Sequence, residues 1–206
     1  MSRLAGRRLY LCTPDRPDLP EFLETCIAGG VDLVQLREKD LDDRLLLRRA
    51  ALAAGICREK GVPFLLNDRP DLALACGADG VHVGQDDIPA SFARTILGPG
   101  AIIGLSTHSE SELAASQSEP VDYVSVGPVT ETPTKPGRPG TGLGYLRHAA
   151  IHAGRRFFVT GGVTPETVPS LIAAGATRFV VVRYLCQAGD PGEAARRLRE
   201  AIDSSG

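Results

Sequence analysis

One stretch near the N-terminus carries an amide and two cations at alternating positions. These are Gln35, Arg37 and Lys39, at the end of an apolar run. If the run is a β-strand, alternate side chains point the same way, so the three polar groups share one face. Arg offers a forked donor and Lys a point charge, a combination that suits a polyanion such as a diphosphate. A solvated strand end paired with a neighbouring acid would have the same sequence, and this stretch alone does not decide.

Carboxylates follow the next two apolar runs. Asn67–Asp68 ends one run, and Asp86 and Asp87 follow another. Neighbouring strands are about 4.8 Å apart, so acids from both loops could reach one ion. Mg²⁺ commonly takes one or two carboxylates together with water and substrate phosphate. We therefore predict Asp68 and Asp87 as Mg²⁺ ligands, and Asp86 as a helix cap.

A fifth run is followed by Ser106, Thr107 and His108. The two hydroxyls could bond a phosphate or cap the next helix. No carboxylate partner for His108 is evident, so we assign it to the helix cap rather than to acid–base chemistry. His82 lies inside an apolar run, and we predict a core histidine with a hydrogen-bonded ring.

Two segments near the C-terminal end are typical of a phosphate site. Gly161 and Gly162 follow an apolar run, and Val182 and Arg183 close the last one. Glycine lets a phosphate approach main-chain N–H groups, although a Gly-Gly pair also suits a plain turn.

A connection rich in Gly, Pro and Thr, residues 127–142, precedes this region. Long connections are uncommon in compact domains and often act as lids. This one carries Thr132, Thr134 and Lys135, two hydroxyls and an ammonium. We expect them to reach a bound anion, although Thr and Pro are also common in surface loops.

Short apolar runs alternate with amphipathic stretches along the whole chain. The predicted strands are Arg8–Cys12, Asp32–Arg37, Pro63–Asn67, Gly80–Val83, Ala101–Gly104, Tyr123–Val126, Phe157–Thr160 and Arg178–Val182. The predicted helices are Leu19–Ala28, Asp42–Glu59, Pro70–Cys76, Pro89–Leu97, Glu110–Gln117, Leu143–Ala153, Pro165–Ala174 and Pro191–Ile202. Prolines at Pro70, Pro165 and Pro191 and the acids Asp42–Asp43 support four of the helix starts.

Eight β–α units in this length predict an α/β fold, a single (β/α)₈ TIM barrel over residues 1–206. Glycines end several helices just before a strand begins, as in Cys76–Gly77–Ala78–Asp79. Tight helix-to-strand turns and longer strand-to-helix loops are typical of a barrel whose site lies at the strand C-termini. An open, doubly wound sheet is the alternative, because repeats alone do not prove closure.

Composition excludes several kinds of partner. The net charge is −2 and tryptophan is absent, so we expect no nucleic acid. No apolar run approaches the ~20 residues of a membrane span and no apolar signal core is present, so we expect a cytoplasmic protein. Five cysteines without a C-x-x-C pair fit free thiols in a reducing compartment. Whether the chain forms a homo-oligomer is left open.

Together these motifs resemble the thiamine phosphate synthase family over nearly the whole chain. The segments that carry the resemblance, in the family's order, are QLREK (35–39), ND (67–68), GVHVGQDD (80–87), GLSTHS (104–109), TPTK (132–135), TGGV (160–163) and VVVR (180–183). The resemblance implies Mg²⁺-dependent coupling of a hydroxymethylpyrimidine diphosphate to a thiazole monophosphate, which yields thiamine phosphate and pyrophosphate. Diphosphate would leave first, and the thiazole nitrogen would capture the resulting pyrimidine methylene cation.

The resemblance also implies a role for each matching residue. The pyrimidine diphosphate would be held by Gln35, Arg37, Lys39, Asn67, Ser106 and Lys135, of which Arg37, Lys39, Ser106 and Lys135 would be catalytic. Mg²⁺ would be held by Asp68 and Asp87. The thiazole phosphate would be held by Thr132, Thr134, Gly161, Gly162, Val182 and Arg183. Arg183 departs from the family's pattern, where many relatives have a small serine.

Two other functions fit parts of the sequence. A related thiazole tautomerase has a similar barrel, but it expels no diphosphate and has no need of the paired acids, the cationic strand face or the lid lysine. A non-catalytic barrel that senses a phosphorylated ligand would tolerate loss of these groups, and here all of them are present.

Overall fold

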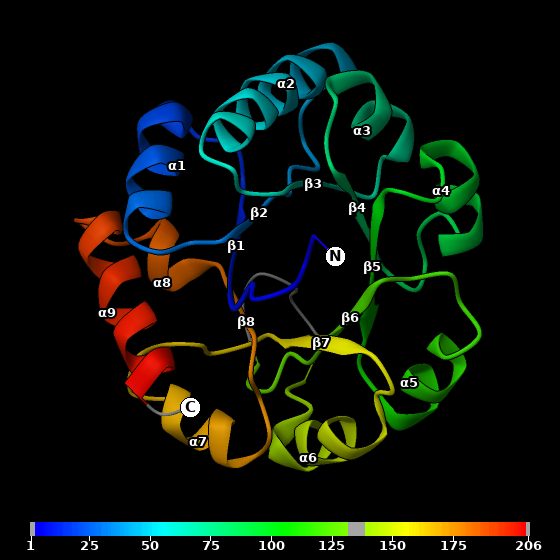
Figure 1. The fold of residues 1–206 in the computed structure, drawn as a ribbon, viewed down its shortest axis with the longest axis vertical. Helices are drawn as coiled ribbons and strands as arrows, with labels where there is room; N and C mark the ends of the chain where they lie inside the picture. The colour runs from blue at the N-terminus through cyan, green and yellow to red at the C-terminus, as the bar shows by residue number, and fades with distance from the viewer. Residues whose placement is uncertain (1–2, 132–138, 205–206) are drawn as a thin grey trace.

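The eight strands close into one parallel barrel in chain order (Figure 1). The computed structural model describes residues 3–131 and 139–204. The strands are β1 (Leu9–Thr13), β2 (Leu33–Leu36), β3 (Phe64–Asn67), β4 (Gly80–Val83), β5 (Ile102–Thr107), β6 (Tyr123–Val126), β7 (Arg156–Val159) and β8 (Phe179–Val181). β8 pairs with β1 in parallel, which completes the (β/α)₈ TIM barrel and rules out the open sheet.

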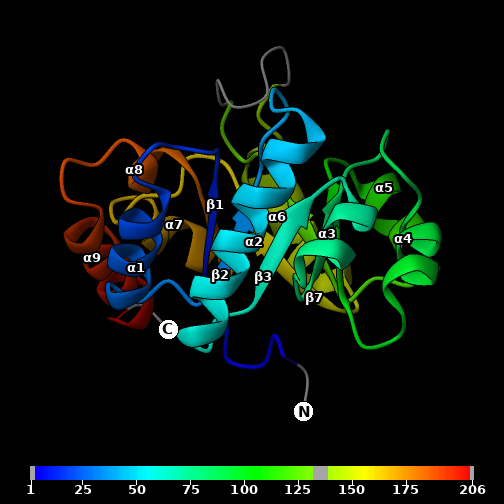
Figure 2. The same ribbon diagram turned by 90° about the horizontal axis from the view of Figure 1, so that it is seen from above.

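Helices surround the barrel on its outside (Figures 1 and 2). They are α1 (Leu19–Ala28), α2 (Asp43–Glu59), α3 (Pro70–Cys76), α4 (Ala90–Leu97), α5 (Glu110–Ser116), α6 (Gly142–His152), α7 (Val168–Ala173), α8 (Arg183–Cys186) and α9 (Pro191–Ser204). The predicted alternation of strands and helices is therefore confirmed, with boundaries shifted by a few residues at most elements.

Side-chain alternation divides the strand residues between two apolar layers. Outward-facing residues such as Val34 and Leu36 pack with the helices in the larger core. Inward-facing residues such as Tyr10, Tyr123 and Phe158 form a second cluster inside the barrel. Because both faces of each strand are buried, the strands are nearly continuous runs of apolar residues in the sequence.

Local signals in the sequence explain several helix ends. The Asp42 carboxylate accepts a hydrogen bond from the Leu45 N–H at 2.9 Å and caps α2, as predicted. Gly77 ends α3 in the left-handed conformation, at φ 69°, where a Cβ would be strained. α3 and α9 begin at the prolines that predicted them.

Two predictions about helix starts are wrong, and one short helix was missed. α7 begins at Val168 rather than Pro165, because residues 165–167 form a turn before the helix. The N-cap of α4 is Pro89, so Asp86 is not a helix cap. The four-residue α8 was not predicted, because β8 and this short helix read together as one apolar segment.

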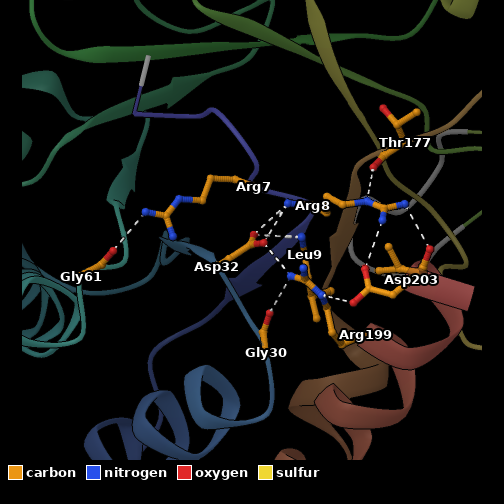
Figure 3. Close-up of polar contacts among 10 residues, drawn as sticks. Arg7, Arg8, Leu9, Gly30, Asp32, Gly61, Thr177, Arg199 and Asp203 are labelled. Atoms are coloured by element: carbon orange, nitrogen blue, oxygen red, sulfur yellow. Dashed lines mark hydrogen bonds and ion pairs between the residues drawn. The ribbon is translucent and has the colours of Figure 1, made fainter. Parts of the chain in front are cut away.

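Three aspartates brace the N-terminal face of the barrel. Each directly precedes an even-numbered strand and accepts a main-chain N–H at the start of the strand before it. The donor and acceptor pairs are Leu9 to Asp32 at 2.9 Å, Phe64 to Asp79 at 2.8 Å and Ile103 to Asp122 at 2.8 Å. Each aspartate also forms an ion pair with an arginine: Asp32 with Arg199, Asp79 with Arg3 and Asp122 with Arg94. Figure 3 shows the first of these clusters, in which Asp32 joins β1 to α9.

Among the described residues, no helix combines the length and apolar character needed to cross a bilayer. All five cysteines are free thiols, and four of them are buried.

Candidate active site

A cavity of about 540 Å³ opens at the end of the barrel where the strands terminate. Every predicted site residue in the described part of the chain lines it. These residues are Gln35, Arg37, Lys39, Asn67, Asp68, Asp87, Ser106, Gly161, Gly162, Val182 and Arg183. Thr132, Thr134 and Lys135 lie outside the described residues. Tertiary structure thus brings together groups that are up to about 150 positions apart in sequence.

The first side of the cavity combines a cation with two carboxylates. Lys39 Nζ lies 2.8 Å from an Asp68 oxygen, so the lysine pairs across the cavity and not with its sequence neighbours. The Asp87 side chain lies within hydrogen-bonding reach of Asp68. Burial raises the pKa of Asp68, the hydrogen bond from Lys39 opposes that rise, and the Asp87 carboxylate adds to it.

Main-chain contacts hold Asp68 and Asp87 in place, and the backbone of Asp68 has an unfavourable conformation. Asp68 has φ 61°, and it is the one non-glycine residue with positive φ in the described chain. Its N–H donates to the His82 carbonyl at 2.9 Å, a contact that supports this unfavourable conformation. An Asp87 oxygen accepts the Gly84 N–H at 2.8 Å, and a Cβ at Gly84 would lie only 2.8 Å from the same carboxylate.

The donor set on this side fits Mg²⁺. Two carboxylates in contact supply hard oxygen ligands, and a divalent cation between them would relieve the repulsion that raises the pKa of Asp68. No group of three or more His, Cys, Asp or Glu ligands occurs in residues 3–131 and 139–204. Asp68 and Asp87 would supply two ligands, and water or a substrate phosphate would complete the coordination shell, as is common for Mg²⁺.

Two arginines line the cavity without a hydrogen-bonded acceptor for their guanidinium groups. The guanidinium groups of Arg37 and Arg183 make no hydrogen bond or close ion pair with any described residue, and Arg37 has a longer-range electrostatic interaction with Glu38. Both line the main cavity and an adjoining hollow of about 340 Å³ between β1 and α8. Partner-free guanidinium groups on a concave surface are suited to bind a phosphate or carboxylate from a ligand.

The opposite side of the cavity is a glycine turn after β7. Gly161 and Gly162 have φ values of 97° and 72°, which a side chain would strain. A Cβ on Gly161 would lie 2.6 Å from the Val129 nitrogen, and one on Gly162 would lie 2.2 Å from the Thr130 hydroxyl. The turn therefore needs both glycines to pack against the segment after β6, and it leaves main-chain atoms lining the cavity.

A chain of buried polar groups forms the floor of the cavity. His82 Nδ1 lies 2.8 Å from the Tyr123 hydroxyl and Nε2 lies 3.0 Å from Ser106 Oγ. This confirms the prediction of a histidine with a hydrogen-bonded ring, although the histidine also lines the cavity. Tyr10 and Gln35 continue the chain on the far side of Tyr123.

His108 differs from the prediction. Its Nδ1 lies 2.9 Å from Glu112, and the same carboxylate accepts the His108 N–H at 2.8 Å. The cap of α5 is Ser109, which accepts from the Glu112 N–H at 3.2 Å. The carboxylate partner was missed because it lies four positions on, one turn into the next helix.

Sequence reasoning also missed Tyr10, Cys12, Ser125 and Tyr123, which line the cavity or lie directly beneath it. Strand alternation could have found them, because residues two apart in β1 and in β6 face the barrel interior together. They read instead as ordinary members of apolar strands.

A TIM barrel with paired acids, cations and a glycine turn around one cavity defines a class: barrels that bind phosphorylated ligands at the C-terminal ends of their strands. A family model described as thiamine monophosphate synthase matches residues 9–185. This chain belongs to that family, and its homologues place it among the transferases.

Relatives match over nearly the full chain. A thiamine-phosphate synthase from Mycolicibacterium smegmatis is 45% identical, covering 100% of this chain and 96% of the relative. One from Acidothermus cellulolyticus is 48% identical and covers 93% of each chain. The solved thiamine phosphate pyrophosphorylase from Pyrococcus furiosus has a TM-score of 0.89 at 27% identity, covering 99% of this chain and 98% of that one.

Proposed function

We propose that the chain is a Mg²⁺-dependent thiamine phosphate synthase. It would join 4-amino-2-methyl-5-hydroxymethylpyrimidine diphosphate to 4-methyl-5-(2-phosphoethyl)thiazole, or its carboxylated form, and release pyrophosphate. One observation carries the proposal: a single cavity combines paired acids and cations on the β2–β4 side with a glycine turn and an arginine on the β7–β8 side. Two anion sites that face each other suit a reaction between two phosphorylated molecules.

On the first side, the diphosphate would meet three cationic groups. Arg37, whose guanidinium makes no hydrogen bond in the described chain, would bind it with two donors, and Lys39 would exchange its contact with Asp68 for one with phosphate. Lys135 would reach it from the connection after β6. Gln35, Asn67 and Ser106 are buried polar residues on the cavity wall and would hold the rest of the pyrimidine diphosphate.

Mg²⁺ held by Asp68 and Asp87 would neutralise charge on the diphosphate as it leaves. Among the protein's own residues, Arg37, Lys39 and Lys135 would share that charge, which grows on the bridging oxygen as the bond to the pyrimidine methylene breaks. The lone pair of the thiazole nitrogen would then form the new C–N bond to the methylene cation. This sequence requires no protein nucleophile.

On the second side, the thiazole phosphate would bind at Gly161, Gly162, Val182 and Arg183, together with Thr132 and Thr134. The main-chain atoms at the glycine turn and the partner-free Arg183 guanidinium support this assignment. We further propose that residues 1–206 act as one catalytic domain in the cytoplasm, where five thiols would stay reduced.

One assay tests the function. Purified protein is incubated with both phosphorylated heterocycles, with and without Mg²⁺, and thiamine phosphate and pyrophosphate are measured. Formation of both products only with Mg²⁺ supports the synthase. Conversion of the thiazole without pyrophosphate release would indicate a tautomerase, and ligand binding without turnover would indicate a sensor.

A further inference from the structure

A continuous chain of hydrogen bonds runs beneath the cavity from Gln35 to Ser106. The Gln35 amide nitrogen donates to the Tyr10 hydroxyl, which lies 3.0 Å from the Tyr123 hydroxyl. Tyr123 contacts His82 Nδ1 at 2.8 Å, and His82 Nε2 contacts Ser106 Oγ at 3.0 Å. Both ends of the chain are cavity-wall residues that the proposed function assigns to the pyrimidine diphosphate.

A glycine on the strand between them leaves the space in which His82 and Tyr123 meet. His82 on β4 and Tyr123 on β6 are both in register with Gly104 on the strand between them. A Cβ at Gly104 would lie 2.3 Å from the Tyr123 hydroxyl and 2.5 Å from His82 Nδ1. The imidazole and the phenol therefore meet across a position where only a glycine leaves room.

The number of protons in this chain is limited. Burial raises the pKa of Tyr10 and of Tyr123 well above the usual tyrosine range, so each hydroxyl keeps one proton. A neutral imidazole also carries one. Each link needs one donor, so choosing the donor at one end decides the direction of every link after it.

The orientation of the Gln35 amide decides which group is the donor at that end of the chain of hydrogen bonds. Its oxygen lies 3.3 Å from Cys12 Sγ, where it accepts the thiol hydrogen, and its nitrogen donates to Tyr10. Tyr10 must then donate to Tyr123, and Tyr123 must donate to His82 Nδ1. The imidazole proton is thereby held on Nε2, which donates to Ser106.

The alternatives conflict with this amide orientation. If the imidazole carried its proton on Nδ1, the Tyr123 hydroxyl would have to accept it. Tyr123 would then either leave its own proton without an acceptor or donate it to Tyr10, which would face the Gln35 amide with a second donor. A doubly protonated ring produces the same clash of donors. Either arrangement loses a hydrogen bond in a buried site, at considerable cost.

The consequence appears at Ser106. Its oxygen accepts from His82, so its own proton is not used in that link. Within the described part of the chain, its oxygen also accepts from Ser125 Oγ at 3.5 Å, the outer limit of a hydrogen bond, and this contact does not use the Ser106 proton either. The Ser106 proton can therefore point into the cavity as a donor.

We propose that Tyr123 and His82 are positioning residues: oriented by the Gln35 amide, they hold His82 as the Nε2–H tautomer and turn the Ser106 hydroxyl proton toward the anionic ligand. The functional part rests on the proposed synthase activity, because that activity supplies the ligand. The tautomer itself does not depend on it.

Long-range ¹H–¹⁵N correlation spectra of the ¹⁵N-histidine-labelled protein test the tautomer. The chain has four histidines, and a His82→Gln variant assigns the signal. We expect a neutral ring with the proton on Nε2, and a changed tautomer signature in Tyr123→Phe. A proton on Nδ1, or a doubly protonated ring at pH 8, would overturn the proposal whether or not the protein is a synthase.

Kinetics test the coupling to Ser106. Tyr123→Phe should lower kcat about three- to tenfold with little change in KM, the effect of one lost hydrogen bond on a charge that develops in the transition state. In a Ser106→Ala background the same change should lower kcat less than about twofold, because the hydroxyl that it orients is gone.

Tyr145→Phe is the matched control. The Tyr145 hydroxyl is also buried and donates at 2.7 Å to Thr107 on β5, the residue after Ser106, but neither residue lines the cavity. Its kcat should stay at the wild-type value. An equal loss in Tyr145→Phe, or an undiminished effect of Tyr123→Phe in the Ser106→Ala background, would assign Tyr123 a packing role only. If the wild type forms no thiamine phosphate, the proposed function fails and the spectra alone decide the tautomer.

Discussion

Replacing Asp32 by Ala should destabilise the protein and leave its catalysis intact. Asp32 accepts from the Arg8 N–H at 2.9 and 3.0 Å, from the Leu9 N–H at 2.9 Å and from Arg199 at 2.9 Å (Figure 3). The variant leaves two main-chain donors and a guanidinium without this acceptor. The cluster lies on the N-terminal face of the barrel, where no residue lines the candidate active site.

The magnitude follows from the contacts. Each amide loses a hydrogen bond of about 1 kcal/mol, and the partly exposed ion pair adds about 1 kcal/mol, so we expect a loss of about 3 kcal/mol. With a urea m-value of about 2 kcal/mol/M, the unfolding midpoint should fall by about 1.5 M. Urea unfolding followed by circular dichroism measures this, and kcat/KM at 20 °C should stay within about twofold of wild type.

Asp203 provides the control, because it contacts two of the same residues from a more exposed position. Its carboxylate pairs with Arg8 at 3.1 Å and with Arg199 at 2.8 Å, but it accepts no main-chain N–H from β1. Asp203→Ala should cost less than about 1 kcal/mol. The reasoning is refuted if Asp32→Ala is no less stable than Asp203→Ala, or if kcat/KM falls while the urea midpoint does not.

Three further outcomes are expected. Lys135→Ala should lower turnover at saturating substrate by about 10²-fold or more, and unchanged steady-state rates would remove this lysine from the mechanism. Asp68→Ala should abolish the dependence on Mg²⁺, whereas a wild-type metal titration curve in the variant would contradict a ligand role. Hydrogen bonds from Arg69 hold the pKa values of Asp43 and Asp71 below the usual 3.8. The stability that these two ion pairs contribute is present above pH 3.8 and is lost as the pH falls through the lowered pKa values. Arg69→Met should therefore make stability fall less steeply below about pH 4 in acid-unfolding curves. An acid-unfolding curve with the wild-type slope in this pH range would argue against the prediction.

The sequence predicted the barrel because its signals are local and repeated. A strand such as Gly80–Val83 and a helix such as Leu19–Ala28 have the same bounds in the structure as in the prediction. Errors occurred where local signals overlap. β5 continues to Thr107 rather than ending at Gly104, because the polar residues Ser106 and Thr107 look like the start of a loop.

The candidate site was predictable for a related reason. The alternation of Gln35, Arg37 and Lys39 predicted a common direction. Gln35 lies within β2 and the other two follow its end, and all three line the cavity. The glycines after β7 were recognisable because main-chain conformation restricts residue type. Whether these residues bind the proposed substrates is a prediction that the assays above test.

The sequence by itself determined which side chains share a face, where most helices begin and end, and which family the motifs resemble, because these depend on residues a few positions apart. Only the tertiary structure decided which partners those side chains meet. Lys39 pairs with Asp68, and His82 meets Tyr123 across Gly104, because barrel closure and strand register bring together residues that the chain separates by about 30 to 40 positions. Such contacts depend on the relative placement of whole strands, which no local pattern of residues specifies.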